Sequence, residues 1–558
     1  MLSKINKLII LFLIIFYQTP LFSKSFDQHQ MHNYFSALVS LEKNKYQQSL
    51  KFFNSSKQLK ESHISYIKKY IFSLVQSGKV SKAINEIKLM KNKKFADFFE
   101  AHLLLVIDSL KKKNYKKSTN YLKNLSENEN EGTFEFIISR YLQQYIYLFN
   151  ENTIKSNLDE GFGKLSLINR SLQSCYLEKS ETENLFQSLV NYNTDENSRY
   201  LFFYANYLID KKKYLKAKSL FKDTNVLNST LLISQAKMWV DQENLNNFSQ
   251  FFSCKDPSHI ISELFFIISN LHSTENEIEK SNFYFNISNY LNPKFKFNLA
   301  LLADNFYEKE EFSKAKKVLK KFDKKNNVYY WYGIKKNAQI INKEEGEDKS
   351  FKYILEKFNQ IEKPSVKTVY EMANIIKSFK KYDLSIKYYT KVLSKLDSKS
   401  FIYADVLYRR GGSYERLGNK KESDKDLLKS LEINPNEPHV LNYLAYSWLE
   451  RNYNIDEAMS MLKKAYSQRQ NDPYIIDSIG WAYYLIGDYF EAEKLLRKAV
   501  QIMPLDPIVN DHYGDILWKL GRKTQANYFW KNVLTFEDTE EKMKKDIKYK
   551  LIKGPKNS

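Results

Sequence analysis

Apolar and polar positions between Ala404 and Leu534 follow a helical period, and the whole pattern recurs about every 34 residues. Each copy carries two small residues at fixed spacing; the two sets are Gly411, Ala445, Gly480 and Gly514, then Ser423, Ala458, Ala492 and Ala526. In three copies a glycine lies between the two: Gly418, Gly487 and Gly521. This length predicts one helical hairpin per copy, because two helices of about a dozen residues and two short turns occupy ~34 residues.

The copy from Pro473 to Asp506 shows the physical reason for the pattern. Gly480 and Ala492 fall in mid-helix, where a residue without bulk lets two helices approach closely. Apolar residues at helical spacing form the stripe that each helix must bury: Ile476, Ile479, Tyr483, Leu495, Leu496 and Ala499. Pro504 and Pro507 end one hairpin and begin the next. Since one hairpin cannot bury its stripe alone, we expect the hairpins to stack.

At these positions the chain resembles the tetratricopeptide repeat (TPR) family, through Ile479, Gly480, Tyr483, Gly487, Tyr489, Ala492, Ala499 and Pro504. The second copy departs from the family pattern in two places. One extra residue lies in the turn from Arg451 to Ile455, and Gln470 stands where proline is usual. The resemblance implies an all-α, right-handed superhelical solenoid of antiparallel helix pairs. The last ~130 residues are similar to bacterial exported TPR proteins.

Weaker copies extend the solenoid toward the amino terminus. They are marked by pairs of residues at the same spacing: Ala37 and Ser49, Ile71 and Ala83, Val106 and Ser118, Ala205 and Ala217, Ala303 and Ala315. We predict degenerate repeats over 26–341, a charged break over 342–365, a regular array over 366–536, and a capping helix with a tail over 537–558. The polar segment 124–132 is typical of a loop.

The amino terminus has the layout of a secretory signal peptide. Lys4 and Lys7 precede the apolar run from Leu8 to Phe16, and Ser23 and Ser25 follow near the expected cleavage site. The run is shorter than the ~20 apolar residues that span a bilayer. We predict a signal peptide over 1–25, or an uncleaved anchor in the inner membrane. Either places the repeats in the periplasm of a Gram-negative bacterium.

Composition raises a second class of partner. The net charge of +22 is compatible with binding to nucleic acid, lipopolysaccharide or an anionic membrane. No nucleic-acid signature accompanies this charge, and lysines such as Lys111 to Lys113 are typical of exposed helix ends. We therefore favour solubility as the role of the charge. Any membrane contact is expected only through an uncleaved amino terminus.

The two cysteines and eight histidines suggest no chemistry. Cys175 and Cys254 lack CxxC or Cys/His spacing; they could pair in an oxidising compartment, but we favour two buried thiols. His29 and His32 could share a helix face but lack a third ligand. The run from Gly161 to Lys164 lacks the rest of a phosphate loop and predicts a turn. We expect no catalytic residues, no metal and no cofactor.

One face of the first helices in the regular array collects aromatic and acidic residues: His439, Asn442, Tyr446, Tyr474, Asp477, Trp481, Tyr484, Asp511, Asp515 and Trp518. First helices line the inner surface of TPR arrays, so these residues are our predicted partner-binding set. The alternative is that some, above all Trp481 and Tyr484, pack between neighbouring helices. Because Asp477 and Asp511 lie on this face, we predict no clamp for a terminal carboxylate. Replacing both with lysine should abolish partner capture and leave helicity intact.

These observations predict a non-catalytic adaptor of the bacterial cell envelope that binds a partner peptide or helix in a concave groove. Two alternatives remain: a membrane-anchored assembly factor that keeps Leu8 to Phe16, and a binder of lipopolysaccharide or nucleic acid. An enzyme would require a mixed α/β unit within 124–298.

Overall fold

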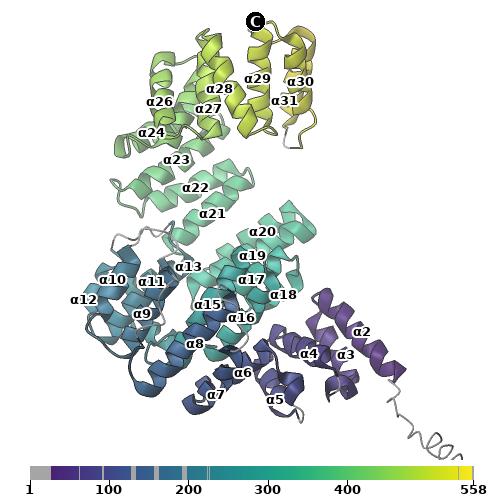
Figure 1. Ribbon diagram of the computed structural model, residues 1–558. Coiled ribbons are helices and arrows are strands. Elements are labelled where there is room, and N and C mark those ends of the chain that lie inside the picture. The colour runs from purple at the N-terminus through teal and green to yellow at the C-terminus, as the bar shows by residue number, and fades with distance from the viewer. Residues whose placement is uncertain are drawn as a thin grey trace, which may run out of the picture. The chain divides into compact units, whose positions relative to one another are not determined.

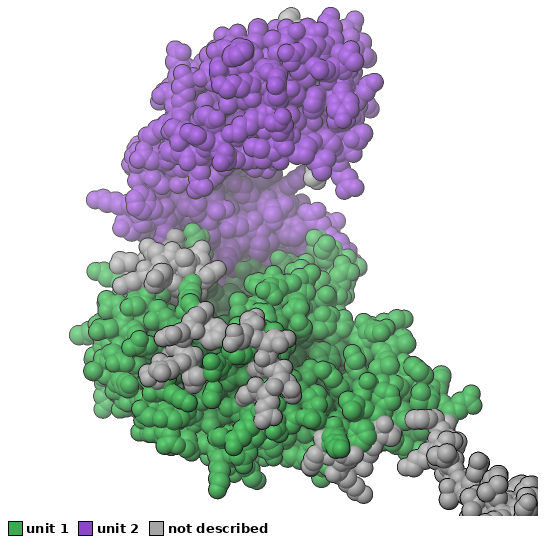
Figure 2. Space-filling model, viewed as in Figure 1, with its two compact units in different colours: residues 1–344 green, residues 345–558 purple. Residues whose placement is uncertain are grey.

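The structure is a computed structural model that describes residues 27–555 except 62, 91–92, 127–132, 156–162, 192–197, 223, 225–226 and 538. Every regular element in these residues is a helix (Figure 1), which confirms the predicted all-α solenoid of helix pairs. The predicted signal peptide lies outside the described residues. The chain divides into two compact units, unit 1 from Met1 to Glu344 and unit 2 from Glu345 to Ser558 (Figure 2).

Unit 1 consists of helical hairpins joined by short turns. Its α-helices are α2 (Gln28–Glu42), α3 (Tyr46–Ser55), α4 (Ile64–Gln76), α5 (Val80–Lys88), α6 (Phe99–Lys111), α7 (Tyr115–Ser126), α8 (Phe134–Glu151), α9 (Lys164–Tyr176), α10 (Thr182–Asn191), α11 (Ser198–Asp210), α12 (Tyr214–Ser219), α13 (Leu231–Asp241), α14 (Asn246–Phe251), α15 (Pro257–Thr274), α16 (Ile278–Leu291), α17 (Leu299–Glu308), α18 (Phe312–Leu319) and α19 (Asn327–Glu345). Short 3-10 helices lie at Lys57–Glu61, Lys93–Ala96 and Lys296–Asn298.

The residue pairs that marked the weaker copies lie on the two helices of one hairpin in each case. Ala37 and Ser49 are on α2 and α3, and Ala303 and Ala315 are on α17 and α18; all four are buried. One boundary differs from the prediction, since the first three residues of the predicted loop 124–132 continue α7, where Leu125 is buried. Within 133–298 the described elements are all helical, so no mixed α/β unit is found there.

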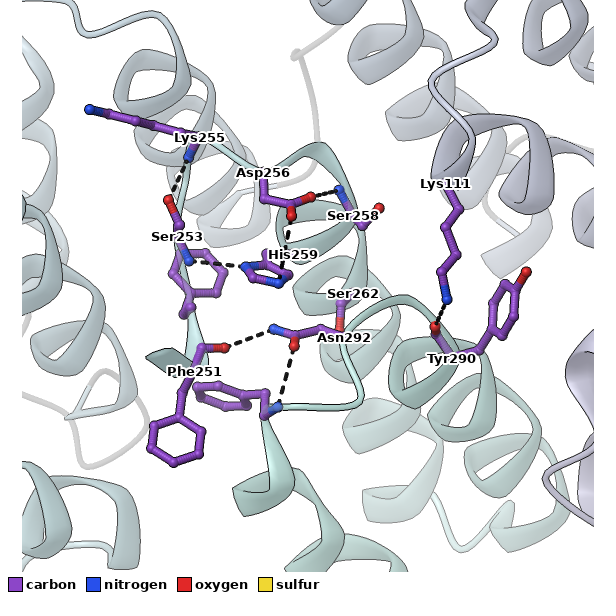
Figure 3. Close-up of polar contacts among 12 residues, drawn as sticks. Lys111, Phe251, Ser253, Lys255, Asp256, Ser258, His259, Ser262, Tyr290 and Asn292 are labelled. Atoms are coloured by element: carbon purple, nitrogen blue, oxygen red, sulfur yellow. Dashed lines mark hydrogen bonds and ion pairs between the residues drawn. The ribbon is translucent and has the colours of Figure 1, made fainter. Parts of the chain in front are cut away.

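Hairpins far apart in the sequence of unit 1 lie side by side. Gln76 on α4 donates a hydrogen bond to the carbonyl of Glu279 on α16 at 2.5 Å. Lys111, at the end of α6, donates to the carbonyl of Tyr290 and lies over its ring (Figure 3). One continuous buried cluster runs from Tyr34 to Ile340. The early hairpins of unit 1 thus pack against its later ones, and its interior is filled by side chains.

Cys175 and Cys254 form a disulfide, so the expectation of two free buried thiols was wrong. The two residues are 79 positions apart, but the stacking of α9 beside the α14–α15 connection brings their Cα atoms to 5.9 Å. Lys255 joins the same two segments through an ion pair with Glu178 at 2.8 Å. Beyond the connection, Asn292 donates to the carbonyl of Phe251 at 2.9 Å (Figure 3).

Unit 2 is a regular run of hairpins, each with an inner and an outer helix. Its helices are α20 (Glu347–Asn359), α21 (Val366–Ser378), α22 (Tyr382–Leu393), α23 (Phe401–Arg416), α24 (Lys420–Ile433), α25 (Pro438–Leu449), α26 (Ile455–Gln468), α27 (Pro473–Leu485), α28 (Tyr489–Ile502), α29 (Pro507–Lys519), α30 (Lys523–Val533) and α31 (Glu541–Lys553). The charged segment 342–365 is largely helical, because Ile354 and Phe358 give α20 a buried stripe.

The small residues of the repeat lie where paired helices are closest. A methyl group on Gly480 would lie 2.9 Å from Cγ of Leu496, and one on Gly514 would lie 2.6 Å from Cδ1 of Trp530. Both distances are shorter than carbon atoms can tolerate, so these positions need glycine. Gly487 has a φ of +84° in the turn after α27, a conformation that side chains disfavour.

We predict that Gly514→Ala destabilises unit 2 by about 2 kcal/mol, because the added methyl group overlaps the fully buried Trp530 ring. Gly333→Ala is the matched control, because the nearest atom to its methyl group would be 3.6 Å away. That change should be neutral or stabilise α19 by about 0.5–1 kcal/mol. Urea denaturation followed by circular dichroism measures both. Equal effects of the two substitutions would contradict the packing explanation.

Candidate functional site

The inner helices of unit 2 border a cavity of about 600 Å³ near the end of the array. Its lining comes from the carboxy-terminal end of α25, from α27, from α29 and from the final helix α31. Lining residues include Glu450, Trp481, Tyr484, Asp511, Asp515 and Lys550. Four of these belong to the predicted partner-binding set. The site is therefore a concave, aromatic and charged surface on successive inner helices.

A buried ion pair between Asp477 and His512 joins α27 to α29. Nδ1 of His512 lies 2.9 Å and 3.1 Å from the two carboxylate oxygens of Asp477. Burial by itself lowers the pKa of His512, but the negative charges of Asp477, Asp511 and Asp515 outweigh it and raise that pKa above its usual value. The three carboxylates therefore stabilise the charged form of the imidazole. Asp477 is 5% exposed, so its carboxylate fixes the helix pairing and does not face solvent.

The aromatic residues of the site also bridge neighbouring helices. The Trp481 ring stacks on His512 at 4.1 Å and on Tyr484 at 4.7 Å between centroids. Its indole N–H donates to the carboxylate of Glu450 at 3.1 Å. Trp481 thereby contacts α25, α27 and α29 together, as the packing alternative for this residue predicted. Its side chain remains half-buried and borders the cavity.

Helix α31 supplies the cation that balances the acidic residues of α29. Nζ of Lys550 lies 2.6 Å from Asp511 and 2.8 Å from Asp515. Burial is the largest cause that raises the pKa of Asp515, to about 6, and the charge of Asp511 adds to it. The indole of Trp518 packs against Gly554, where a methyl group would lie 2.6 Å from the ring. The end of the chain therefore covers Trp518 and part of α29.

The structure divides the predicted partner-binding set by accessibility. Tyr474 and His439 are exposed, and Tyr474 has an exposed fraction of 59%. Four are half-buried on the inner face: Asn442, Tyr446, Trp481 and Asp511. Asp477, Tyr484 and Asp515 are buried, because the adjacent inner helix or α31 covers them. Trp518 is half-buried beneath Gly554. The exposed residues and the four half-buried residues of the inner face can therefore contact a partner.

Much of the cavity lining was missing from the predicted set, including three residues whose contacts are described above: Glu450, His512 and Lys550. The spacing of His512, one repeat after Asp477, was the signal that could have found it. No such signal points to Lys550, because α31 lies beyond the repeats.

The described residues contain one group with metal-ligand geometry, His272, Glu275 and Glu277 at the α15–α16 turn. Nδ1 of His272 contacts Glu277 at 2.6 Å, and Lys280 binds the other oxygen of that carboxylate at 2.8 Å. Both groups are thus already paired with protein atoms. His29 and His32 both lie exposed on α2 and are not part of this group.

Comparison with known proteins identifies the class of repeat. Family models described as tetratricopeptide repeats match residues 404–437 and 474–503, which are the α23–α24 and α27–α28 hairpins. The TPR repeat-containing protein PA4667 of Pseudomonas aeruginosa is 33% identical over 111 residues, which is 20% of this chain and 19% of that protein. The chain therefore contains tetratricopeptide repeats in unit 2, and it spans about a fifth of the curated relative it matches.

Solved structures of TPR proteins resemble parts of the chain. The protein TTC0263 of Thermus thermophilus covers 34% of this chain and 100% of its own length, with 16% identity and a TM-score of 0.29. A TPR protein from Parabacteroides merdae covers 40% of this chain and 85% of its own, with 17% identity and a TM-score of 0.31. MamA from Desulfovibrio magneticus covers 32% of this chain and 97% of its own length, with 15% identity and a TM-score of 0.27.

The buried pair changes the expected result of the lysine substitution at Asp477. We predict that Asp477→Lys destabilises unit 2 by about 3–5 kcal/mol, because it places a second cation beside the buried His512. Asp511→Lys should destabilise unit 2 less, because Asp511 is half-buried. Thermal unfolding of the two single variants measures this difference, and equal losses would contradict the assignment of Asp477 to the helix junction.

The raised pKa of His512 predicts a pH dependence. The folded chain holds this proton more tightly than the unfolded chain, so the stabilisation is complete below the usual pKa of ~6.5 and is lost as pH rises through the folded value. The free energy of unfolding of unit 2 should therefore fall as the pH rises above ~6.5. Urea titrations of wild type and His512→Gln test this, and the variant should show a smaller fall. An identical pH profile in the variant would contradict the role of His512.

Proposed function

We propose that this protein is a non-catalytic interaction scaffold of the bacterial cell envelope, which binds a segment of a partner protein on the inner face of unit 2. The observation that carries this proposal is the cavity of about 600 Å³, bordered by half-buried Trp481 and Asp511. Exposed His439 and Tyr474 extend the same inner face. Large aromatic side chains with polar groups beside them provide contact area at a low entropic cost.

The filled interior of unit 1 supports the choice of unit 2 as the binding surface. Its interior is filled where α4 and α6 pack against α15 and α16. In unit 2 the inner helices contact mainly their neighbours, so side chains remain accessible. The proposed binding surface therefore belongs to unit 2.

The proposed envelope location rests on two features. The disulfide between Cys175 and Cys254 is of a kind that persists in oxidising compartments such as the periplasm. The residues before unit 1 have the sequence pattern of an export signal. Among the described residues, no helix is long and apolar enough to cross a membrane.

Amino-terminal sequencing of the mature protein separates the two envelope forms. A secreted scaffold should begin close to residue 26, whereas an anchored assembly factor should keep Met1 to Phe16. A mature protein recovered from the cytoplasm with its first residues intact would contradict export in either form.

The disulfide provides an independent test of the compartment. The protein from cells should carry the Cys175–Cys254 bond, and Cys175→Ser should destabilise unit 1 by about 3 kcal/mol because the bond closes a long loop. Cys254→Ser should cost the same, since both changes break one bond. Alkylation before and after reduction, followed by mass spectrometry, measures the oxidised fraction. A fully reduced pair in cells would contradict the oxidising location.

Site-specific photo-crosslinking tests the binding surface. A crosslinking amino acid at Tyr474, which is 59% exposed on α27, should capture a defined partner protein in cells. The same amino acid at Tyr528, which is 62% exposed on the outer helix α30, is the matched control. Equal capture at the two positions would contradict binding on the inner face. A captured nucleic acid or lipopolysaccharide, with affinity that falls steeply with salt, would favour the polyanion alternative.

A further inference from the structure

The first inner helices of unit 2 carry a cluster of cations made by Lys377, Arg409 and Arg416. Nζ of Lys377 donates one hydrogen bond, to the carbonyl of Arg409 at 3.1 Å. Among the described residues, no carboxylate lies within 4 Å of this ammonium group. Arg416 is exposed, and its nearest carboxylate, Glu415, is 4.0 Å away. Within the described part of the chain, Lys377 therefore has no carboxylate in direct contact, and Arg416 has one long ion pair.

Gly412 allows this cluster to form. A methyl group at Gly412 on α23 would lie 2.9 Å from Nζ of Lys377 and 3.4 Å from the hydroxyl of Tyr443. Side chains from α21 and α25 thus converge above a position without a side chain. The pKa of Lys377 falls to about 8, first because of burial and then because of the charges of Arg409 and Arg416.

The acidic groups near this cluster are already engaged. Asp405 accepts hydrogen bonds from Tyr370 at 2.8 Å and from Arg409 at 3.1 Å. Glu415 pairs with Lys420 and accepts from Tyr443 at 3.4 Å. An additional anion could therefore bind Lys377 and Arg416 without displacing a protein carboxylate.

The far end of the same inner face has the opposite charge. Six carboxylates lie at or beside the cavity: Glu450, Asp477, Asp511, Asp515, Glu540 and Asp546. Four basic side chains lie there: His512, Lys519, Lys542 and Lys550. Glu450 accepts a hydrogen bond from the neutral indole of Trp481, and Oδ1 of the buried Asp515 has no hydrogen-bond partner among the described residues. This end carries an excess of negative charge.

The two ends lie on one contiguous surface. Tyr443 on α25 donates a hydrogen bond to Glu415 on α23, next to Arg416, and Glu450 at the end of α25 accepts one from Trp481, which stacks on His512. From Lys377 on α21 to Glu450 at the end of α25 is two helix spacings of about 9 Å, or about 18 Å. An extended chain covers this distance with about five residues.

We propose that the inner face of unit 2 binds an extended partner segment with acidic side chains at one end and a lysine or arginine about five residues away. This inference rests on the proposed function and adds the chemistry of the ligand. The acidic end contacts Lys377 and Arg416, and the basic end contacts Glu450 beside Trp481. Charge order along the segment, more than net charge, then determines affinity.

Synthetic fluorescent peptides test this with the full-length protein. Two block peptides carry three glutamates and three lysines separated by neutral residues, in either chain direction, and a third has the same composition with alternating charges. Fluorescence anisotropy should show at least about tenfold tighter binding for one block peptide than for the alternating one, equivalent to one hydrogen-bonded charge pair. Equal binding of all three peptides, or no binding by either block peptide, overturns the proposal.

Charge reversal locates the two ends. Arg416→Glu should weaken binding of the block peptide about tenfold. A peptide in which lysines replace the three glutamates should bind this variant again. Arg497→Glu is the control, because Arg497 is half-exposed on the outer helix α28. Equal effects of the two substitutions overturn the proposal. If Tyr474 captures a partner whose affinity is unchanged by Arg416→Glu, the charge order is wrong while the binding surface stands.

Discussion

The structure depends on burial of each hairpin's apolar stripe against the next hairpin. Gly480 and Gly514 let inner and outer helices approach closely enough for Leu496 and Trp530 to fill the space between them. Because every hairpin repeats this packing, inner helices lie side by side and carry their polar faces in one row. The binding surface is thus a consequence of the core, since residues far apart in sequence meet only if the hairpins stack regularly.

The same packing has different outcomes in the two units. In unit 1 the early hairpins pack against later ones, aromatic side chains fill the interior, and the Cys175–Cys254 bond joins distant segments. In unit 2 the inner helices carry exposed and half-buried side chains, and α31 covers the end of the row through Lys550. At that end the buried side chains of Asp477 and His512 contact each other in place of water. The unit thus combines a stabilised end with an open face.

Sequence reasoning predicted the fold more completely than the site. The period between Gly411 and Gly514 predicted the hairpins, because packing of small residues is local to one repeat. The disulfide was missed because two isolated cysteines carry no spacing signal. Asp477 was assigned to the solvent-facing set by counting along one helix, but its exposure depends on His512 in the next repeat. The spacing of one repeat between Asp477 and His512 could have shown that the two residues are neighbours, but counting along a single helix does not use it.

The account claims that the inner face of unit 2 is the surface that a partner covers. Hydroxyl-radical footprinting of the protein, alone and with its captured partner, tests this directly, because it reports the accessibility of individual aromatic side chains. Tyr474 on the inner face and Phe490 on the outer helix α28 are both exposed in the free protein. The account predicts that the partner protects Tyr474 and Trp481 and leaves Phe490 unchanged. Protection of Phe490 with Tyr474 still reactive would contradict it.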